Sequence, residues 1–328
     1  MYRNTFLSFH RMDLPFHRIG LPFHRIESIL KKFMSDHSVS TYKFDPSAAN
    51  IVAYQGEPGA YSHLACKHSF PDWTAVHCAT FSDALTMVEN GDAYYAMIPV
   101  ENSTAGRVEE IYRELKRTEL YVVKEHFEPV NHCLLIRESS TTAHIKRVGS
   151  HPQALAQCDS NIKALGAVNV AMYDTAGAAK HLSENDDDTL AVISSELAAE
   201  LYGLQIAKSH FNDVAGNTTR FLVFSRQQKQ PEFELVKTYI TSFMFRVRNI
   251  PAALYKAMGG FATRGINMLK LESYMVNGHF TATQFYVDVE AHFQESKMQA
   301  ALEELMFFSE EIRILGTYEA DSYRKDKA

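Results

Sequence analysis

Cysteine is scarce in this sequence, and the four cysteines among its 328 residues show no C-x-x-C spacing. Neither a set of disulfides nor a zinc framework is therefore expected, and we predict no metal site. No apolar run approaches the roughly 18 residues that cross a membrane, and no signal-peptide core is present. A basic surplus is also missing, since the formal net charge is −6, which argues against nucleic acid as a partner. We expect a cytoplasmic protein.

The start of the sequence carries a short repeat. Phe-His-Arg recurs every seven residues, beginning at Phe9, Phe16 and Phe23, and Pro15 and Pro22 interrupt the heptads. A proline removes a helical hydrogen bond and clashes with the preceding turn, so the heptads do not predict a coiled coil. We interpret residues 1–48 as a low-complexity, disordered extension that the fold does not need.

From residue 51 to about 225, short apolar runs alternate with segments of helical periodicity. The runs predict buried strands at residues 51–54, 95–100, 132–136, 145–149, 169–173, 190–193 and 221–224. Between them, apolar residues such as Phe81, Leu85 and Val88 recur at helical spacing. This alternation is typical of an α/β fold with largely parallel sheets, in which ligands bind at loops after the strands.

A polar segment, residues 229–236, reads as a linker to a compact C-terminal unit. Residues 237–320 predict strands at 238–247, 266–274, 280–289 and 312–317, with helices at 252–263 and around 298–306. Asn277-Gly278 is a strong hairpin signal between the second and third strands. The order βαββαβ is that of the ferredoxin-like split motif. Residues 321–328 are left as a C-terminal tail.

Polar loops follow the predicted strands of the first region repeatedly. They comprise residues 56–62, 101–106, 150–153, 174–177 and 194–195, together with 217–221, which precedes the last predicted strand. Their hydroxyl and amide groups, with free backbone N–H groups where helices begin, suit a small carboxylated molecule. One such loop is ordinary capping or turn chemistry. Six in succession predict a ligand-binding cleft.

These loops, in this order, resemble the signature segments of the prephenate dehydratases, at residues 56–62, 99–106, 150–158, 174–179 and 217–221. Residues 248–254 and 270–273 are similar to the ACT regulatory domain of that family. The resemblance implies a catalytic domain at residues 49–228 with two lobes like a periplasmic binding protein, followed by an ACT domain at 237–320. It also implies a homodimer or homotetramer in which ACT domains pair.

The resemblance implies the conversion of prephenate to phenylpyruvate, water and CO2 in phenylalanine biosynthesis. Aromatisation drives this reaction, so no cofactor is expected. The essential threonine of the family corresponds to Thr219, which would donate a hydrogen bond to the departing oxygen. A true proton could come from Glu101 or His151, and the sequence leaves that choice open.

The other substrate-binding residues that the resemblance implies are Asn102, Ser103, Thr104, Gln153, Thr175, Arg220 and Phe221. Arg220 would pair with a substrate carboxylate. Because adjacent residues of a strand point to opposite faces, Thr219 and Arg220 can share the cleft only if the chain is not yet extended there.

The C-terminal unit is expected to bind phenylalanine as an allosteric effector. The effector-binding residues that the resemblance implies are Asn249, Pro251, Ala253, Leu254, Asn267, Glu272 and Ser273. Ala252 stands where the family has glycine, and its methyl group should remove access to positive φ. Tyr274-Met275 stands where the family has Arg-Pro, so the identity of the effector stays open.

Several alternatives remain. Arogenate, with an amine in place of the side-chain keto group, could replace prephenate, and two lobes around a cleft also describe a non-catalytic binding module. With only 50 residues before Ile51, no chorismate mutase domain is expected. No G-x-S-x-G motif suggests a hydrolase. His63, His68 and His77 lie close in sequence without a metal-ligand pattern, and we interpret them as surface or structural residues.

Overall fold

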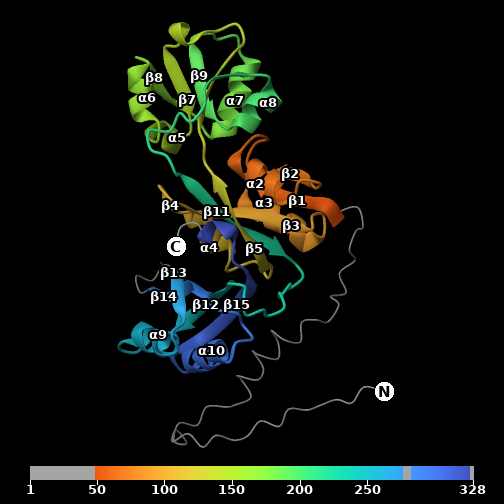
Figure 1. The fold of residues 1–328 in the computed structure, drawn as a ribbon, viewed down its shortest axis with the longest axis vertical. Coiled ribbons are helices and arrows are strands. Elements are labelled where there is room, and N and C mark those ends of the chain that lie inside the picture. The colour runs from red at the N-terminus through yellow and green to blue at the C-terminus, as the bar shows by residue number, and fades with distance from the viewer. Residues whose placement is uncertain (1–48, 276–281, 326–328) are drawn as a thin grey trace, which may run out of the picture. The chain divides into compact units, whose positions relative to one another are not determined.

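The structure, a computed structural model, describes residues 49–275 and 282–325 of the chain. The proposed N-terminal extension and the Asn277-Gly278 turn lie outside the described residues. The described ranges contain three β-sheets, two in the region of α/β pattern and one in the C-terminal unit (Figure 1). None of the helices in these ranges is long and apolar enough to cross a membrane.

The first lobe is built on a six-stranded sheet in the order β2-β1-β3-β11-β5, with β4 paired to β3. Its strands are β1 (Ile51–Gln55), β2 (Thr74–Cys78), β3 (Tyr95–Asn102), β4 (Gly106–Arg107), β5 (Tyr121–Pro129) and β11 (Thr218–Ser225). Its helices are α2 (Tyr61–Ser69), α3 (Phe81–Asn90) and α4 (Glu109–Glu114). Strand β1 runs parallel to β2 and β3, whereas β11 runs antiparallel to both β3 and β5.

The second lobe contains a five-stranded sheet in the order β10-β6-β9-β7-β8. Its strands are β6 (Cys133–Ile136), β7 (Arg147–Ser150), β8 (Val168–Ala171), β9 (Leu190–Ser194) and β10 (Gln205–Lys208). Its helices are η2 (Thr142–His144), α5 (Pro152–Ala156), α6 (Asp159–Ala164), α7 (Thr175–Glu184) and α8 (Glu196–Tyr202). Strand β6 is antiparallel to both of its neighbours, and β7 is parallel to both of its own.

The prediction of largely parallel sheets is therefore only partly right. The chain passes from the first lobe to the second after β5 and returns before β11, and the strands beside these crossings run against their neighbours. All seven predicted strands of this region are present, but β2, β4, β5 and β10 were not predicted. In β5, Lys124, Glu125, His126 and Glu128 interrupt the apolar pattern, because this strand buries carboxylates that are paired in the tertiary structure.

The C-terminal unit has the predicted order βαββαβ. It comprises β12 (Tyr239–Val247), α9 (Ala253–Thr263), β13 (Asn267–Met275), β14 (Ala282–Glu290), α10 (Ser296–Phe308), β15 (Ser309–Glu319) and the short η3 (Ser322–Arg324). The antiparallel sheet has the order β13-β14-β12-β15. Ala252, at the start of α9, has a φ of 58°. The prediction that its methyl group removes positive φ was wrong, because the turn into α9 imposes this conformation on an alanine.

The C-terminal sheet packs against the first lobe. Leu222 and Phe224 of β11 share one hydrophobic core with Ile240, Met244 and Leu315 of β12 and β15. A Cβ atom on Gly316 would lie 1.9 Å from the carbonyl oxygen of Val122, so β15 reaches β5 this closely only through glycine. Strand β11 therefore has one face toward α2 and the cleft, and the other toward the C-terminal unit.

Candidate active site

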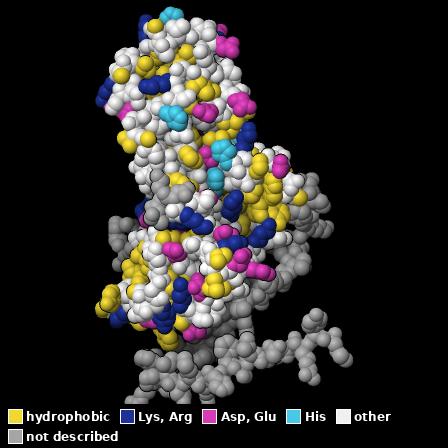
Figure 2. All heavy atoms as spheres, viewed as in Figure 1, with side chains coloured by type: hydrophobic (Ala, Val, Ile, Leu, Met, Phe, Trp, Pro, Cys, Tyr) yellow, Lys and Arg dark blue, Asp and Glu magenta, His cyan; other side chains and the backbone are white. Residues whose placement is uncertain are grey.

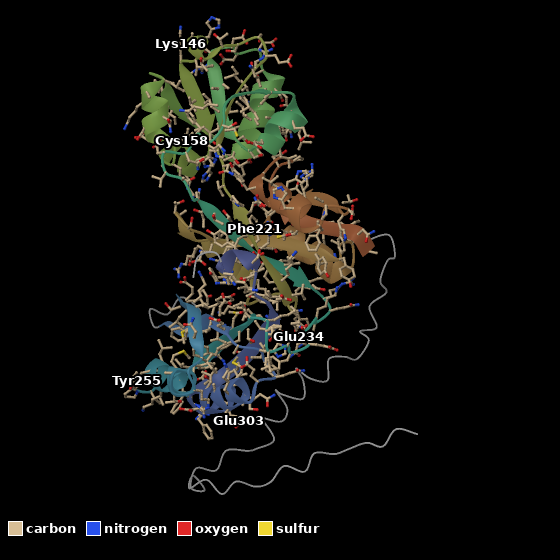
Figure 3. All side chains as sticks on the ribbon, in the orientation of Figure 1. Lys146, Cys158, Phe221, Glu234, Tyr255 and Glu303 are labelled. Atoms are coloured by element: carbon tan, nitrogen blue, oxygen red, sulfur yellow. The ribbon has the colours of Figure 1, made fainter. Side chains whose placement is uncertain are left out.

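A cleft of about 260 Å³ lies between the two lobes. Its walls come from the ends of strands β1, β3 and β11 and from loops and helix starts beside the strands, which include the predicted polar loops. The residues that line it are Gln55, Gly56, Ala60, Tyr61, Ser62, Pro99, Asn102, Val108, Val130, His132, His151, Gln153, Ala154, Gln157, Asp174, Thr175, Asn217, Thr219 and Phe221. Figure 3 labels Phe221 in the first lobe and Cys158, the neighbour of Gln157, in the second.

Thr219 sits in a network of amide side chains on the first-lobe wall. Asn102 Nδ2 donates to Thr219 Oγ1 over 2.9 Å and to Asn217 Oδ1 over 2.8 Å. The other amide atom, Asn102 Oδ1, accepts hydrogen bonds from the backbone N–H groups of Thr104 and Ala105. These bonds fix which end of the Asn102 amide faces Thr219. Since Thr219 Oγ1 accepts from Asn102, its own O–H proton is available to another acceptor.

The network continues into the second lobe. Asn217 Nδ2 donates to Gln157 Oε1 over 3.0 Å, and Gln157 Nε2 donates to Thr104 Oγ1 over 2.9 Å. His132 Nε2 also lies 2.8 Å from Gln157 Oε1. Because that oxygen can only accept, the network assigns the imidazole proton to Nε2. The Tyr61 hydroxyl lies 2.9 Å from the unprotonated Nδ1 and 3.0 Å from the Asn131 carbonyl oxygen, so these two acceptors share its proton. The two lobes are thus joined across the cleft by neutral hydrogen bonds.

Burial keeps the aromatic groups of this wall uncharged. It lowers the pKa of His132, and the hydrogen bond with Gln157 offsets this only in part. Burial also raises the pKa of Tyr61 well above its ordinary value, so the phenol stays protonated. Among the described residues that line the cleft, none is lysine or arginine. The lining therefore offers an anionic ligand the imidazoles and neutral donors of the wall, which include the start of α2, where Ala60 provides no side-chain cap.

Five of the predicted substrate-binding and catalytic residues line the cleft: Asn102, Gln153, Thr175, Thr219 and Phe221. Ser103 and Thr104 do not belong to the lining, and both are exposed. Ser103 Oγ accepts a hydrogen bond from the Thr218 backbone, and Thr104 Oγ1 donates to Asn102 Oδ1. Of the two suggested proton donors, His151 lines the cleft, whereas the Glu101 carboxylate lies 3.0 Å from Lys270 Nζ and outside the lining.

Arg220 is placed on the opposite side of the sheet. Its side chain is 4% exposed and forms ion pairs with Glu125 and Asp288, at 2.9 and 2.6 Å. The prediction that Arg220 pairs with a substrate carboxylate is contradicted by this placement. The reason is that β11 is already extended from Thr218 onward, so consecutive side chains alternate between the faces.

Sequence reasoning missed three residues of the wall. Tyr61 belongs to the first polar loop, but its place at the start of α2 gave no separate signal. His132 begins a predicted apolar strand, where a histidine reads as structural. Gln157 lies one residue after α5, and only its bonds to Thr104 and Asn217 reveal its role. Figure 2 shows histidine side chains at the surface near the junction of the two lobes.

Comparison with known proteins decides the family. The family model for prephenate dehydratase matches residues 52–229. This chain belongs to the prephenate dehydratase family. It is 46% identical over 280 residues to the bifunctional N-acyl-homoserine lactone acylase/prephenate dehydratase of Komagataeibacter europaeus, covering 84% of this chain and 98% of that protein. It is 38% identical to arogenate dehydratase/prephenate dehydratase 2 of Arabidopsis thaliana, over 83% of this chain and 73% of that protein.

Solved structures of this family share the fold. A structure described as GqqA, a novel type of quorum quenching acylase, matches with a TM-score of 0.79 and 46% identity over 84% of this chain and 99% of its own. The prephenate dehydratase of Arthrobacter aurescens, solved with L-Phe, matches with a TM-score of 0.76 and 28% identity, over 82% of this chain and 90% of its own. The predicted fold class, two catalytic lobes and a ferredoxin-like unit, is confirmed.

Proposed function

We propose that this dehydratase converts prephenate to phenylpyruvate, water and CO2, and that Thr219 is its catalytic residue. The observation that carries the proposal is the hydrogen bond from Asn102 Nδ2 to Thr219 Oγ1 inside the cleft. It orients the threonine hydroxyl so that its proton is directed to an acceptor other than Asn102. In the proposed complex this acceptor is the hydroxyl oxygen that leaves the ring of the substrate.

The reaction needs few participants. As the bond from the ring to its carboxylate breaks, the electron pair enters the ring, and the bond from C4 to the hydroxyl oxygen breaks. The ring becomes aromatic, CO2 departs, and the hydroxide takes up one proton to leave as water. Thr219 stabilises the charge that develops on this oxygen. His151, at the cleft, is the ionisable group we assign to deliver the proton, and the start of α2 is the site we assign to a carboxylate.

The direct test is turnover by the purified full chain. Prephenate, arogenate and an N-acyl-homoserine lactone are supplied separately, the last because the K. europaeus relative carries that activity in its name. Phenylpyruvate is followed by its absorbance in base, phenylalanine and released homoserine lactone by chromatography. The proposal predicts the highest kcat/KM with prephenate. Absence of phenylpyruvate, with turnover of another substrate, would overturn it.

Arogenate is the second candidate substrate, because several relatives near 38% identity are named arogenate dehydratases. Asp174 offers the only carboxylate among the described residues that line the cleft, and it caps α7 by accepting from the Gly177 N–H. Asp174 could pair with the ammonium group by which arogenate differs from prephenate. Asp174→Asn should then lower kcat/KM for arogenate more than for prephenate, whereas an equal decrease would leave Asp174 with a capping role alone.

We also propose that an aromatic amino acid, phenylalanine first, binds residues 237–320 and regulates turnover. The A. aurescens relative solved with L-Phe supports this proposal. Asn249 and Pro251 are exposed at the start of α9, beside the more buried Ala253 and Leu254. On β13, Ser273 is exposed, Asn267 donates to Glu290, and Glu272 pairs with Arg107 of β4 and with Lys270.

These contacts give the effector a route to the cleft. Lys270 pairs with both Glu272 and Glu101, and Glu101 precedes Asn102 in β3. An effector acts only if it binds two enzyme states with different affinity. When phenylalanine, tyrosine and tryptophan are titrated separately, at least one should change the turnover rate of the full chain. Glu272→Gln should reduce the ratio between the turnover rate without this amino acid and the rate at its saturating concentration. Glu303→Gln, at the exposed position labelled in Figure 3, is the control. An unchanged ratio in Glu272→Gln would remove this route.

A homodimer or homotetramer remains part of this proposal. Exposed apolar side chains of the C-terminal unit support it, namely Ile250, Tyr255, Leu271 and Phe307, with Tyr255 84% exposed. Light scattering after size exclusion should give two or four copies, and a monomer at assay concentration would contradict the proposal.

A further inference from the structure

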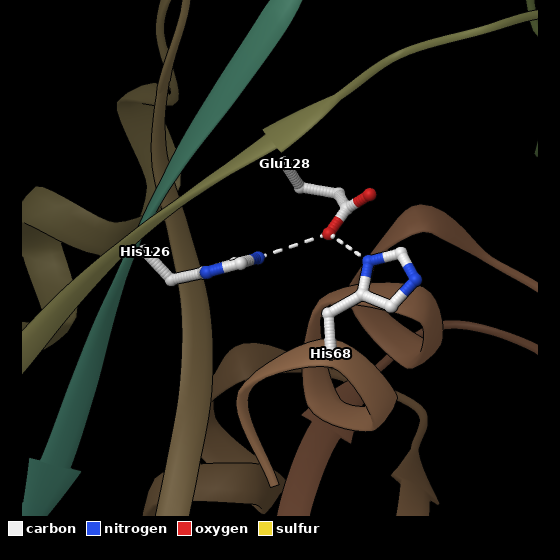
Figure 4. Close-up of side chains that lie close together, drawn as sticks. All are labelled: His68, His126 and Glu128. Carbon is white, nitrogen blue, oxygen red and sulfur yellow. Dashed lines mark hydrogen bonds and ion pairs between the residues drawn. The ribbon is translucent and has the colours of Figure 1, made fainter. Parts of the chain in front are cut away.

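Three ionisable side chains meet beside the cleft without taking part in the network around Thr219. His126 and Glu128 lie two residues apart on β5 and share one face of the sheet. His68, in the last turn of α2, completes the group (Figure 4). His68 Nδ1 and His126 Nε2 each lie 2.9 Å from the same oxygen, Glu128 Oε2. All three ligand atoms lie within 4.8 Å of one another.

The charge balance of this group points to a cation. The Glu128 side chain is only 2% exposed, and a buried carboxylate needs a compensating charge. Within the described ranges, its ion-pair partners are the two histidines. A divalent cation at the centre of the group would compensate the carboxylate and use both nitrogen lone pairs.

The ligand set and the spacing select the kind of cation. Two imidazoles and one carboxylate are the ligands of zinc sites that keep a position open, whereas Mg²⁺ and Ca²⁺ prefer oxygen ligands. Zinc binds nitrogen and oxygen at about 2.1 Å, so its ligand atoms lie about 3.4 Å apart in a tetrahedral site. The separations in this group, from 2.9 Å to at most 4.8 Å, surround that value. Small side-chain rotations therefore suffice.

We propose that His68, His126 and Glu128 bind Zn²⁺ or a similar divalent transition metal ion. The entry side is open, because the His68 side chain is 55% exposed while Glu128 closes the inner side. The bound ion would fasten the end of α2 to β5. Glu128 and His126 stand opposite Thr219 and Phe221 in the sheet register, and α2 begins with Tyr61 in the cleft. The metal would therefore hold a wall of the cleft and supply a fourth, solvent-accessible coordination position.

The experiment measures metal binding by the full chain, independently of dehydratase turnover. Protein treated with a chelator and then dialysed is titrated with ZnCl2 by calorimetry and with CoCl2 by visible absorption. We expect one ion per chain, a Kd below about 10 µM for Zn²⁺, a tetrahedral cobalt spectrum and a rise in melting temperature with zinc. His68→Ala, at an exposed position, should weaken binding at least about 10-fold, as should the isosteric Glu128→Gln.

His144→Ala is the matched control, because this histidine is exposed on η2 and lies outside the group. It should leave the Kd for zinc unchanged. No binding at 100-fold the expected Kd would overturn the proposal, as would an unchanged affinity in both His68→Ala and Glu128→Gln. Equal weakening in His144→Ala would likewise assign the zinc to nonspecific histidine binding. Turnover of prephenate without metal affinity would leave the proposed function standing and remove this site alone.

Discussion

The two faces of strand β11 differ in charge: adjacent residues contribute to a neutral hydrogen-bond network on one face and to buried ion pairs on the other. On the cleft face, Thr219 joins a network of neutral amides and hydroxyls through Asn102. On the other face, Arg220 is enclosed by Glu125, Asp288 and the Tyr318 hydroxyl, and Arg324 pairs with Glu125 from the C-terminal end. The formal charge of β11, on Arg220, thus lies where the C-terminal unit docks, whereas its cleft-facing residues Thr219 and Phe221 carry none.

This difference follows from what each face must bind. A buried ion pair is costly to desolvate and strongly destabilised when one partner is lost, so it suits a contact that is formed permanently. In the proposed reaction, the cleft exchanges an anionic substrate for an anionic product. Neutral donors can do this without leaving an unpaired buried charge each time the site empties. Docking and catalysis are therefore expected to fail separately when adjacent residues of β11 are replaced.

The largest expected effect comes from breaking the charged face. Arg220→Met leaves Asp288 and Glu125 buried with less compensation, and it should lower the free energy of unfolding by about 3–5 kcal/mol. Urea titration monitored by circular dichroism measures this. Arg113→Met, at an exposed position on α4, should stay within about 0.5 kcal/mol of the wild type. Equal stability of Arg220→Met and wild type would show that the charged face does not hold the C-terminal unit.

The next effect belongs to the cleft face. Thr219→Val removes the hydroxyl while keeping its shape, and kcat for prephenate should fall about 100-fold or more, the range for one oriented donor to a transition state. The melting temperature should change little, and Thr219→Ser should restore much of the rate. Thr218→Val is the neighbouring control, since Thr218 lies outside the cleft lining. Wild-type turnover in Thr219→Val would remove Thr219 from the mechanism.

The charged face also predicts a particular loss of stability in acid. Although burial alone would raise it, Arg220 and hydrogen bonds from Ser242 and Tyr286 hold the pKa of Asp288 below its usual range. A lowered pKa in the folded state contributes stability above the unfolded value of about 3.9, which is lost as pH falls through the folded value. Stability measured from pH 7 to 3 should therefore fall more steeply below about pH 4 in the wild type than in Asp288→Asn. Parallel curves would contradict this assignment.

The smallest effect tests the C-terminal unit alone. Ala252→Gly relieves the left-handed conformation at φ 58° and should raise the free energy of unfolding by no more than about 1 kcal/mol. Ala257→Gly, within α9, should change stability in the opposite direction, because glycine is unfavourable inside a helix and a buried methyl group is lost. Equal destabilisation of Ala252→Gly and Ala257→Gly would show that the backbone at Ala252 is not strained by its positive φ.

Local patterns predicted much of this architecture. The apolar runs of β1, β3 and β9 and the order βαββαβ are properties of short segments, so they could be read before any tertiary contact was known. Strand β5 could not be predicted in this way, because carboxylates such as Glu125 and Glu128 are typical of the surface. Their burial depends on partners, Arg220 and His68, that lie in other segments of the chain. The family resemblance predicted that Thr219 lies in the cleft. The prediction that Arg220 also lies there was wrong, because the sequence did not show that β11 begins before this residue.

The sequence by itself determined the family, most of the succession of strands and helices, and the loops whose polar residues form the cleft, since these depend on residues close together in the chain. Only the tertiary structure decided which side chains meet. Gln157 reaches Asn217 across the cleft, Arg220 reaches Asp288 in the C-terminal unit, and His68 reaches Glu128 beside it. Each contact joins segments far apart in sequence, and burial of a polar group without a partner is too unfavourable for these contacts to be left unmade.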